Sequence, residues 1–186
     1  MRRIFATLFL ASALACAGYA RQYACAPALD KPGLPNMHVI APGLYRGAQP
    51  AKEGFEELSK MGIKTVINLR DFHTDKKMIG ALPLNYQSIP IKTWDLGDKQ
   101  VEQFVRIVAD KDNYPIFFHC QHGADRTGTM AAVYRIVFEE WPKEEALKEM
   151  TTCPYGYHSI WKNLRKYIMN LDVEKFKKIK QEAQNK

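Results

Sequence analysis

Residues Pro115–Gly128 read PIFFHCQHGADRTG, an apolar run that ends in His119 and Cys120, followed by five residues and then by Arg126. A strand that leads through such a loop into a helix can wrap a tetrahedral oxyanion. The successive N–H groups of the loop point inward, and the helix adds its positive N-terminus. Arg126 offers a planar, permanently charged fork for two oxygens of that anion. The same positive surroundings favour the thiolate form of Cys120, and Gly123 permits the tight turn.

This segment resembles the signature of the cysteine-dependent protein tyrosine phosphatase superfamily, in which His-Cys, any five residues and Arg are followed by Ser or Thr. The stretch Gly43–Pro50, GLYRGAQP, resembles the opening of dual-specificity-like phosphatases of bacteria and fungi. The other three cysteines do not fit the pattern, because Gln22, Lys31 and Ser159 stand six residues after them. An ordinary buried cysteine in a strand-to-helix turn is the alternative. The resemblance spans about residues 39–169 and is closest to small exported bacterial phosphatases of the dual-specificity type.

The N-terminus has the order of a secretory signal peptide. Arg2 and Arg3 precede an apolar run, and small residues continue to Ala20. The run is too short for an ordinary membrane span, which disfavours a retained anchor. Residues 13–16, ALAC, resemble an imperfect bacterial lipobox, so lipidation of Cys16 would attach the protein to a membrane. Either route predicts export, to the periplasm or to the outer membrane as a lipoprotein facing the periplasm.

Export affects the charge and the cysteines. Removal of residues 1–20 takes away two arginines and no acidic residue, so the formal net charge falls from +7 to +5. Such a surface attracts anionic phosphate esters but is too weakly and diffusely charged to indicate nucleic acid. Cys25, Cys120 and Cys153 remain, an odd number in an oxidising compartment. A Cys25–Cys153 disulfide would leave Cys120 free; the alternatives are three reduced cysteines or a reversibly oxidised Cys120.

The remaining pattern predicts one α/β domain over residues 37–186, preceded by a flexible tether over 21–36 that is rich in proline and lacks periodicity. Alternating strands and helices indicate a central, mostly parallel sheet of four to five strands flanked by helices, as in cysteine phosphatases. The expected strands are 38–40, 44–46, 63–69, 85–91 and 116–118. The expected helices are 51–61, 75–82, 98–110, one from Arg126 to Pro142, 143–151, and a last one marked by Trp161 to Leu171 with a frayed, charged end.

The resemblance implies a division of labour in the loop. Cys120 would attack phosphorus to give a phosphocysteine intermediate, and Arg126 would hold the developing charge. Thr127 would donate to the sulfur when it leaves, and His119 would orient the loop. Substrate contacts would come from Gln121, His122, Gly123, Ala124, Asp125 and Arg126. Asp125 is expected to point away from the dianion and brace the loop through backbone or arginine contacts. His122 would reach either the substrate or the surface.

The family places the general acid on the loop that precedes the helix before the catalytic strand. Two carboxylates qualify, Asp95 and Asp98. Asp98 has a sufficient structural explanation as the N-cap of the next helix. Asp95 has none, and its neighbour Trp94 would provide an apolar setting, so Asp95 is the expected acid. Histidines and cysteines lack metal-site spacing, and neither a metal nor another cofactor is implied.

The leading function is a phosphatase acting on phosphotyrosine in proteins, and in a shallow cleft also on phosphoserine or phosphothreonine. A second hypothesis is an inositol phosphate or phosphoinositide phosphatase. Such relatives often carry lysines within the loop, and residues 121–125 supply none. A third is a phosphate-binding or redox-sensing protein that does not turn over. The expected partner is therefore a phosphoprotein or a small phosphorylated substrate.

Overall fold

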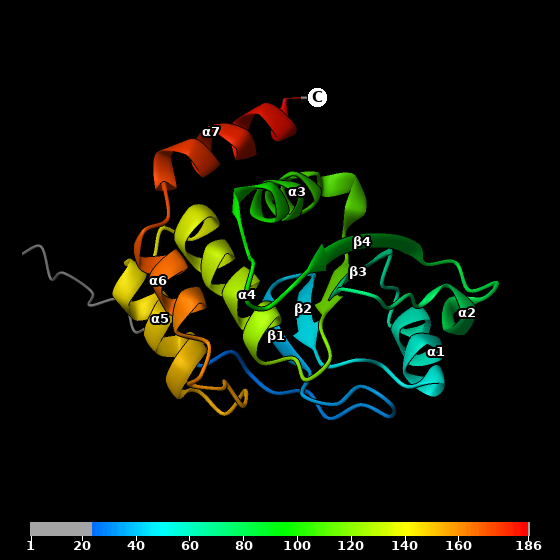
Figure 1. Ribbon diagram of the computed structural model, residues 1–186. Helices are drawn as coiled ribbons and strands as arrows, with labels where there is room; N and C mark the ends of the chain where they lie inside the picture. The colour runs from blue at the N-terminus through cyan, green and yellow to red at the C-terminus, as the bar shows by residue number, and fades with distance from the viewer. Residues whose placement is uncertain (1–23, 186) are drawn as a thin grey trace, which may run out of the picture.

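The computed structural model describes residues 24–185 (Figure 1). A five-stranded sheet forms its centre, with the strand order β1-β2-β5-β3-β4. The β1–β2 pair is antiparallel, and the other neighbours are parallel, as the sequence predicted. The strands are β1 (His38–Ala41), β2 (Leu44–Gly47), β3 (Thr65–Arg70), β4 (Asn85–Ile91) and β5 (Ile116–His119).

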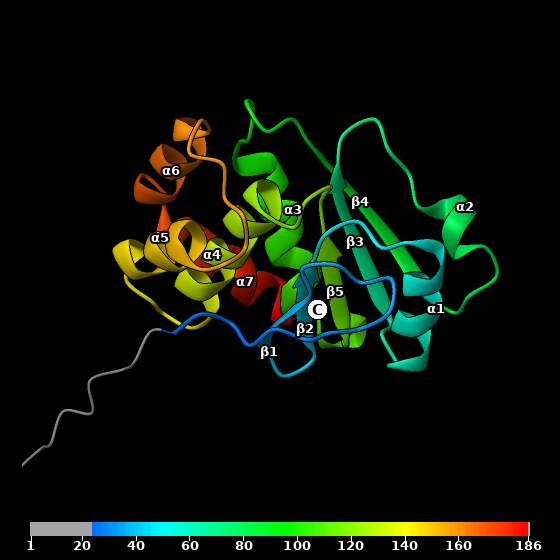
Figure 2. The same cartoon turned by 90° about the horizontal axis from the view of Figure 1, so that it is seen from below.

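Helices cover both faces of the sheet. Figure 2 shows α1 and α2 on one face and α3 to α7 on the other. This two-sided cover agrees with the predicted α/β class. The helices are α1 (Lys52–Lys60), α2 (Lys76–Ile79), α3 (Asp98–Ala109), α4 (Asp125–Phe138), α5 (Lys143–Thr152), α6 (Lys162–Met169) and α7 (Val173–Gln184), with a short 3-10 turn η1 (Lys111–Asn113) after α3.

Strand β5 lies at the centre of the sheet and is buried on both faces. Ile116 and Phe118 pack into the larger core cluster with α3 and α4, whereas Phe117 packs into the smaller cluster with α1. Such a strand reads as a continuous apolar run, because successive side chains point to opposite faces that are both covered. The strand ends at His119, so Cys120 begins the loop at the carboxyl edge of the sheet.

Two terminal segments are more tightly packed than their composition suggested. Residues 24–36 were expected to be part of a tether, but they run along the domain: Leu34 is buried, Ala28 forms a β-bridge with His38, and Cys25 is joined to Cys153 by a disulfide. At the other end, a separate α7 comes after α6. Phe176 of α7 is buried in the larger core, so this helix is docked rather than frayed.

One capping expectation was wrong. Gly97, not Asp98, is the N-cap of α3, and Asp98 is its first helical residue. A carboxylate in the first turn still complements the helix dipole, but the N-cap position no longer accounts for Asp98.

The predicted signal peptide, residues 1–20, and Cys16 lie outside the described residues. Within the described part of the chain, no helix is both long enough and apolar enough to cross a membrane.

Candidate active site

The loop between β5 and α4 is shaped by Gly123. Its φ is +70°, and a Cβ atom built there would lie 2.6 Å from the carbonyl carbon of Gly47 and 2.7 Å from the amide nitrogen of Ala48. No other residue fits this position without moving the backbone at the end of β2. The end of β2 therefore packs directly against the loop and sets its path from Cys120 to α4.

Cys120 lies at the base of this loop with 2% of its surface exposed, and its thiol is free. Arg126 is half-buried in the first turn of α4, and one of its terminal nitrogens lies 3.4 Å from the carbonyl oxygen of Ile91. Arg126 Nε and Thr127 Oγ1 are buried and have no hydrogen-bond partner among the described residues. Both atoms can donate to an oxyanion, and they belong to residues at the N-terminus of a helix, directly after the loop.

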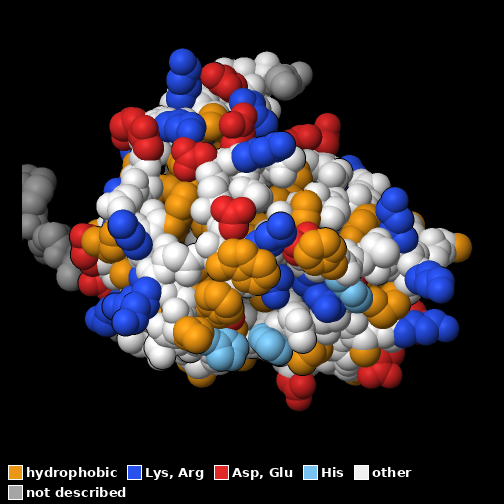
Figure 3. Space-filling view, in the orientation of Figure 1, with side chains coloured by type: hydrophobic (Ala, Val, Ile, Leu, Met, Phe, Trp, Pro, Cys, Tyr) orange, Lys and Arg blue, Asp and Glu red, His pale blue; other side chains and the backbone are white. Residues whose placement is uncertain are grey.

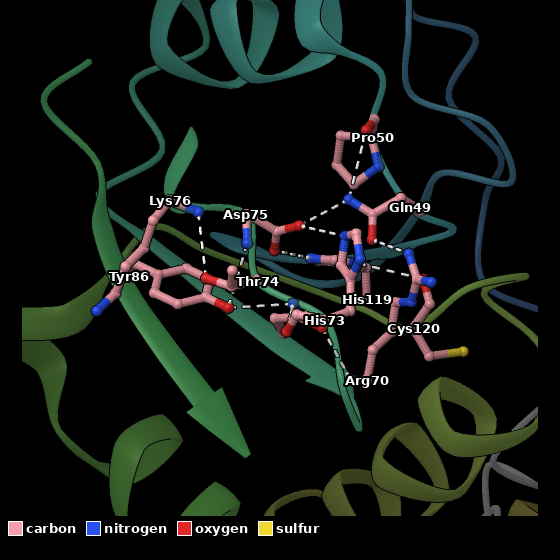
Figure 4. Close-up of polar contacts among 11 residues, drawn as sticks. Gln49, Pro50, Arg70, His73, Thr74, Asp75, Lys76, Tyr86, His119 and Cys120 are labelled. Carbon is pink, nitrogen blue, oxygen red and sulfur yellow. Dashed lines mark hydrogen bonds and ion pairs between the residues drawn. The ribbon is translucent and has the colours of Figure 1, made fainter. Parts of the chain in front are cut away.

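A buried polar network supports the start of the loop (Figure 4). His119 is buried, and its Nε2 lies 3.0 Å from Oδ2 of the buried Asp75, while its Nδ1 lies 3.2 Å from the carbonyl oxygen of Cys120. Gln49 donates to Asp75 Oδ1 at 2.8 Å and accepts from Arg70 at 2.8 Å. The two ring nitrogens of His119 thus both contact oxygen atoms, which fixes the orientation of the imidazole ring.

Asp75 suits this role because its negative charge is held in place. Burial by itself raises the pKa of Asp75, but the hydrogen bond from His119, the charge of His119 and the hydrogen bond from Gln49 together lower it below its ordinary value. A buried carboxylate that keeps its charge needs such partners. The network places an anion next to His119, which adjoins the thiol of Cys120 along the chain.

A second buried group, Arg46 of β2, supports the middle of the loop. Its side chain is 1% exposed and donates to the carbonyl oxygen of Gly123 at 2.6 Å. Its guanidinium carbon lies 4.1 Å from the ring centroid of Tyr155, a cation–π contact. Burial lowers the pKa of Arg46 to about 10, while Tyr155, Glu149 and Cys120 oppose that shift. Arg46 therefore stays charged at neutral pH and places a positive charge that interacts with Cys120.

Asp125 braces the far side of the loop. Its carboxylate accepts from the backbone N–H of His158 at 2.9 Å and contacts His158 Nδ1 at 2.8 Å. The expected bracing role is thus carried by a backbone contact and a histidine, in the segment between α5 and α6. His122 is exposed, and its ring centroid lies 5.6 Å from that of His158. Both oxygens of the Asp125 carboxylate thus contact His158 rather than the N–H groups of the loop.

The two candidate acids differ in their surroundings. Asp95 is exposed in a turn closed by its own N–H, which donates to the carbonyl oxygen of Lys92 at 2.9 Å. Its carboxylate makes no hydrogen bond within residues 24–185. Asp98 accepts from Lys175 of α7 and, at 2.8 Å, from Tyr167 of α6. The hydrogen bonds from Lys175 and then Tyr167 lower the pKa of Asp98, which disfavours its protonated form.

Comparison with known proteins agrees with this geometry. The family model described as "DSP-PTPase phosphatase fused to NAD+ Kinase" matches residues 38–163. The chain belongs to the dual-specificity type of the cysteine-dependent protein tyrosine phosphatases. The dual specificity protein phosphatase TpbA of Pseudomonas aeruginosa strain UCBPP-PA14 is 33% identical over 141 residues. The alignment covers 75% of this chain and 64% of that relative, so the chain spans less than two thirds of its length.

Two further similarities bear on this family. A crystal structure of P. aeruginosa TpbA in complex with phosphotyrosine superposes with a TM-score of 0.75 at 30% identity, covering 87% of this chain and 98% of that chain. An inositol diphosphatase of Arabidopsis thaliana is 26% identical over 155 residues, which cover 77% of this chain and 72% of that protein.

The sequence-predicted residues from His119 to Thr127 run from the end of β5 through the loop into the first turn of α4. Asp95 lies on the β4–α3 segment, which approaches the loop where Arg126 contacts Ile91. The sequence analysis missed the supporting residues Asp75, Gln49 and Arg46. Gln49 and Arg46 stand within the GLYRGAQP stretch, which was noted only for its resemblance to other phosphatases and not for a role in the site. No sequence pattern marked Asp75.

Proposed function

We propose that this protein hydrolyses phosphate monoesters, with phosphotyrosine in proteins as the leading substrate, through a phosphocysteine intermediate at Cys120. The observation that carries the proposal is a buried free thiol at Cys120 that is followed, six and seven residues later, by two buried donors without a partner among the described residues, Arg126 Nε and Thr127 Oγ1. These groups match the requirements of phosphoryl transfer: a nucleophile, a donor for the phosphoryl oxygens and a donor for the sulfur.

The first step forms a sulfur–phosphorus bond. The Cys120 thiolate attacks phosphorus in line, and the bond from phosphorus to the ester oxygen breaks. Asp95 gives its proton to that oxygen, so the alcohol or phenol leaves neutral. Arg126 and the N–H groups of residues 121–126 hold the three equatorial oxygens throughout, which stabilises the charge without a metal.

The second step releases phosphate. The Asp95 carboxylate takes a proton from water as the water oxygen attacks phosphorus, and the sulfur–phosphorus bond breaks. The Thr127 hydroxyl donates to the sulfur as it leaves, which favours the thiolate leaving group. Asp95 suits both steps better than Asp98, because Lys175 and Tyr167 hold Asp98 as a carboxylate.

Hydrolysis of a chromogenic aryl phosphate tests the chemistry. Cys120→Ser is expected to abolish turnover, and Arg126→Ala to lower kcat/KM by about 10³-fold, as for other oxyanion-binding donors. Activity that persists in Cys120→Ser would contradict the mechanism. Circular dichroism and the urea-unfolding midpoint check that each variant keeps its fold.

The acid assignment needs a separate comparison. Asp95→Asn is expected to lower kcat and to remove one limb of the pH–rate profile, whereas Asp98→Asn and the exposed control Asp30→Asn are expected to keep both limbs. A limb lost in Asp98→Asn and kept in Asp95→Asn would reverse the assignment.

Phosphotyrosine is favoured over inositol phosphates for two reasons. TpbA, whose structure includes phosphotyrosine, is more similar in sequence than the inositol diphosphatase. In addition, residues 121–125 contain no lysine to bind further phosphate groups. Initial rates on a phosphotyrosyl peptide, a phosphoseryl peptide and an inositol polyphosphate rank the three substrate classes directly.

We also propose that the chain is exported. The Cys25–Cys153 disulfide supports this, because disulfides persist in oxidising compartments. Fractionation of cells that express the full chain is expected to recover it outside the cytoplasm. Labelling with a palmitate analogue, lost in Cys16→Ser, would identify the lipoprotein form. Unlabelled protein in the soluble periplasmic fraction would identify cleavage near Ala20.

A further inference from the structure

The apolar side chains that the fold leaves in solvent are unevenly placed. Within residues 24–185, four large ones are prominently exposed: Phe72 at 92%, Ile160 at 75%, Trp94 at 68% and Met169 at 37%. The three most exposed lie on three different connecting segments. Phe72 is between β3 and α2, Trp94 is between β4 and α3, and Ile160 is between α5 and α6.

Each of these segments lies next to the phosphate loop, the loop between β5 and α4, or contacts a residue of the first turn of α4. Strands β3 and β5 are parallel with Asn68 opposite His119, so Phe72 lies beyond the same sheet edge as the loop. The second segment begins at Ile91, whose carbonyl oxygen contacts Arg126. The third contains His158, held by Asp125.

The three segments also contact one another. Lys92 Nζ lies 5.9 Å from the ring centroid of Phe72, which connects the first segment to the second. Asn163, in the first turn of α6 directly after the third segment, donates to the carbonyl oxygen of Thr93 at 2.8 Å, which connects the end of the third segment to the second. The segments that carry the exposed side chains therefore lie around the loop between β5 and α4. Figure 3 shows basic side chains in the middle of this face with apolar side chains on either side of them.

The backbone at Phe72 supports a role outside the fold. Its φ is +54°, a left-handed conformation that is a genuine outlier for a bulky residue. Asparagine or glycine would occupy this position with less strain, and a side chain that is 92% exposed contributes little to the core. The fold itself therefore does not account for a phenylalanine at this position.

We propose that Phe72, Trp94 and Ile160 form an apolar rim that binds the aromatic ring and the neighbouring apolar residues of a phosphotyrosyl peptide. The inference rests on the proposed function, because it requires that the phosphoryl group sits in the loop above Cys120. Donors in the centre and apolar side chains around them fit a ligand with one phosphoryl group on an apolar body. An inositol polyphosphate instead carries charge around its whole ring and would bring phosphates against the rim.

The test uses the rim triple variant Phe72→Asn, Trp94→Ala and Ile160→Ser. Asparagine tolerates the left-handed conformation at position 72, and the other two side chains are exposed, so the variant is expected to fold. Met169→Ala is the matched control. The Met169 side chain is also exposed, but the residue lies at the end of α6, outside the three segments. Its backbone carbonyl oxygen accepts a hydrogen bond from Lys143 of α5.

Three readouts separate the rim from the chemistry. For a phosphotyrosyl peptide with leucine and valine beside the phosphotyrosine, KM is expected to rise at least about tenfold in the triple variant. With glycine and serine in those places, the rise is expected to be smaller. The inhibition constant of orthovanadate, which occupies the phosphate loop alone, is expected to stay within about twofold. Met169→Ala is expected to match the wild type throughout.

An unchanged KM for the apolar-flanked peptide in the triple variant would overturn the rim while leaving the proposed phosphatase intact. Faster hydrolysis of an inositol polyphosphate than of either peptide by the wild type would also overturn it. So would a dimer, seen by analytical ultracentrifugation, that the triple variant abolishes, since the rim would then bind a second copy. Failure of the wild type to hydrolyse any phosphate ester would instead refute the proposed function.

Discussion

Removal of the Cys25–Cys153 disulfide is expected to destabilise this protein strongly. The bond joins residues 128 apart in sequence, with a Cα–Cα distance of 5.7 Å. A loop of that length restricts the unfolded chain enough to contribute about 5 kcal/mol in the chain-entropy account. Cys25 is exposed and Cys153 half-buried, so serine at both positions costs little packing. The loss is then mainly the cross-link itself.

The measurement is urea unfolding of the wild type and of Cys25→Ser/Cys153→Ser, monitored by circular dichroism. The free energy of unfolding is expected to fall by about 5 kcal/mol, and the melting temperature by about 10–20 °C for a chain of this size. Wild type treated with a reductant is the matched control and is expected to unfold as the double variant does. Such a loss is a large part of an ordinary protein's stability.

Two results would contradict this expectation. A loss below about 1 kcal/mol would mean that the cross-link constrains the unfolded chain much less than its loop length implies. A reduced wild type that stays as stable as the oxidised one would mean that the serine substitutions act through local packing. That packing is specific: the N–H of Ala26 faces Tyr155 Oη at 2.6 Å and Glu149 Oε1 at 3.2 Å.

Three further predictions concern the supports of the loop. Arg46→Met removes the charged donor to the carbonyl oxygen of Gly123 and is expected to lower kcat/KM on an aryl phosphate at least about tenfold; unchanged kinetics would show that the loop does not need it. Asp75 has a lowered pKa, so it stabilises the fold above its unfolded pKa of about 3.9, and that contribution is lost as pH falls through the lower folded value. The stability gap between wild type and Asp75→Asn, from urea titrations at pH 2.5 to 7, is therefore expected to close in acid; a pH-independent gap would speak against a charged role. Gly123→Ala forces a Cβ against Gly47 at a positive φ and is expected to cost about 1–3 kcal/mol and to weaken orthovanadate binding; wild-type affinity would exclude a tight loop.

The elements of the sheet were predictable where the pattern was local. Residues 116–118 are continuously apolar, which is typical of a strand buried on both faces, and β5 occupies that place. The core helix α4 was predictable for the same reason, since its apolar residues cover most of its circumference. Composition misled at the two ends. Residues 24–36 look like a linker, and α7 is highly charged, yet a disulfide holds the first and the buried Phe176 docks the second.

The phosphate loop itself is encoded in one short stretch. Cys120, Arg126 and Thr127 lie within eight residues, and the strand before them and the helix after them bring their groups together. These residues are close in space because they are close in sequence. A short turn between a strand and a helix has few conformations, and the expected one directs its N–H groups inward. The candidate nucleophile, the cation and the expected anion site could therefore be predicted from the sequence alone.

The groups that hold the loop are decided by long-range packing. Asp75 meets His119 across 44 residues of sequence, and Arg46 meets Gly123 across 77. No local pattern marks a carboxylate that will be buried against a histidine, because its partner is chosen by which strands become neighbours in the sheet. The same holds for the rim of Phe72, Trp94 and Ile160, which appear in sequence as unrelated loop residues. The order β2-β5-β3 brings the loop supports together, because parallel strands end at a common edge and the segments that continue them lie side by side at that edge.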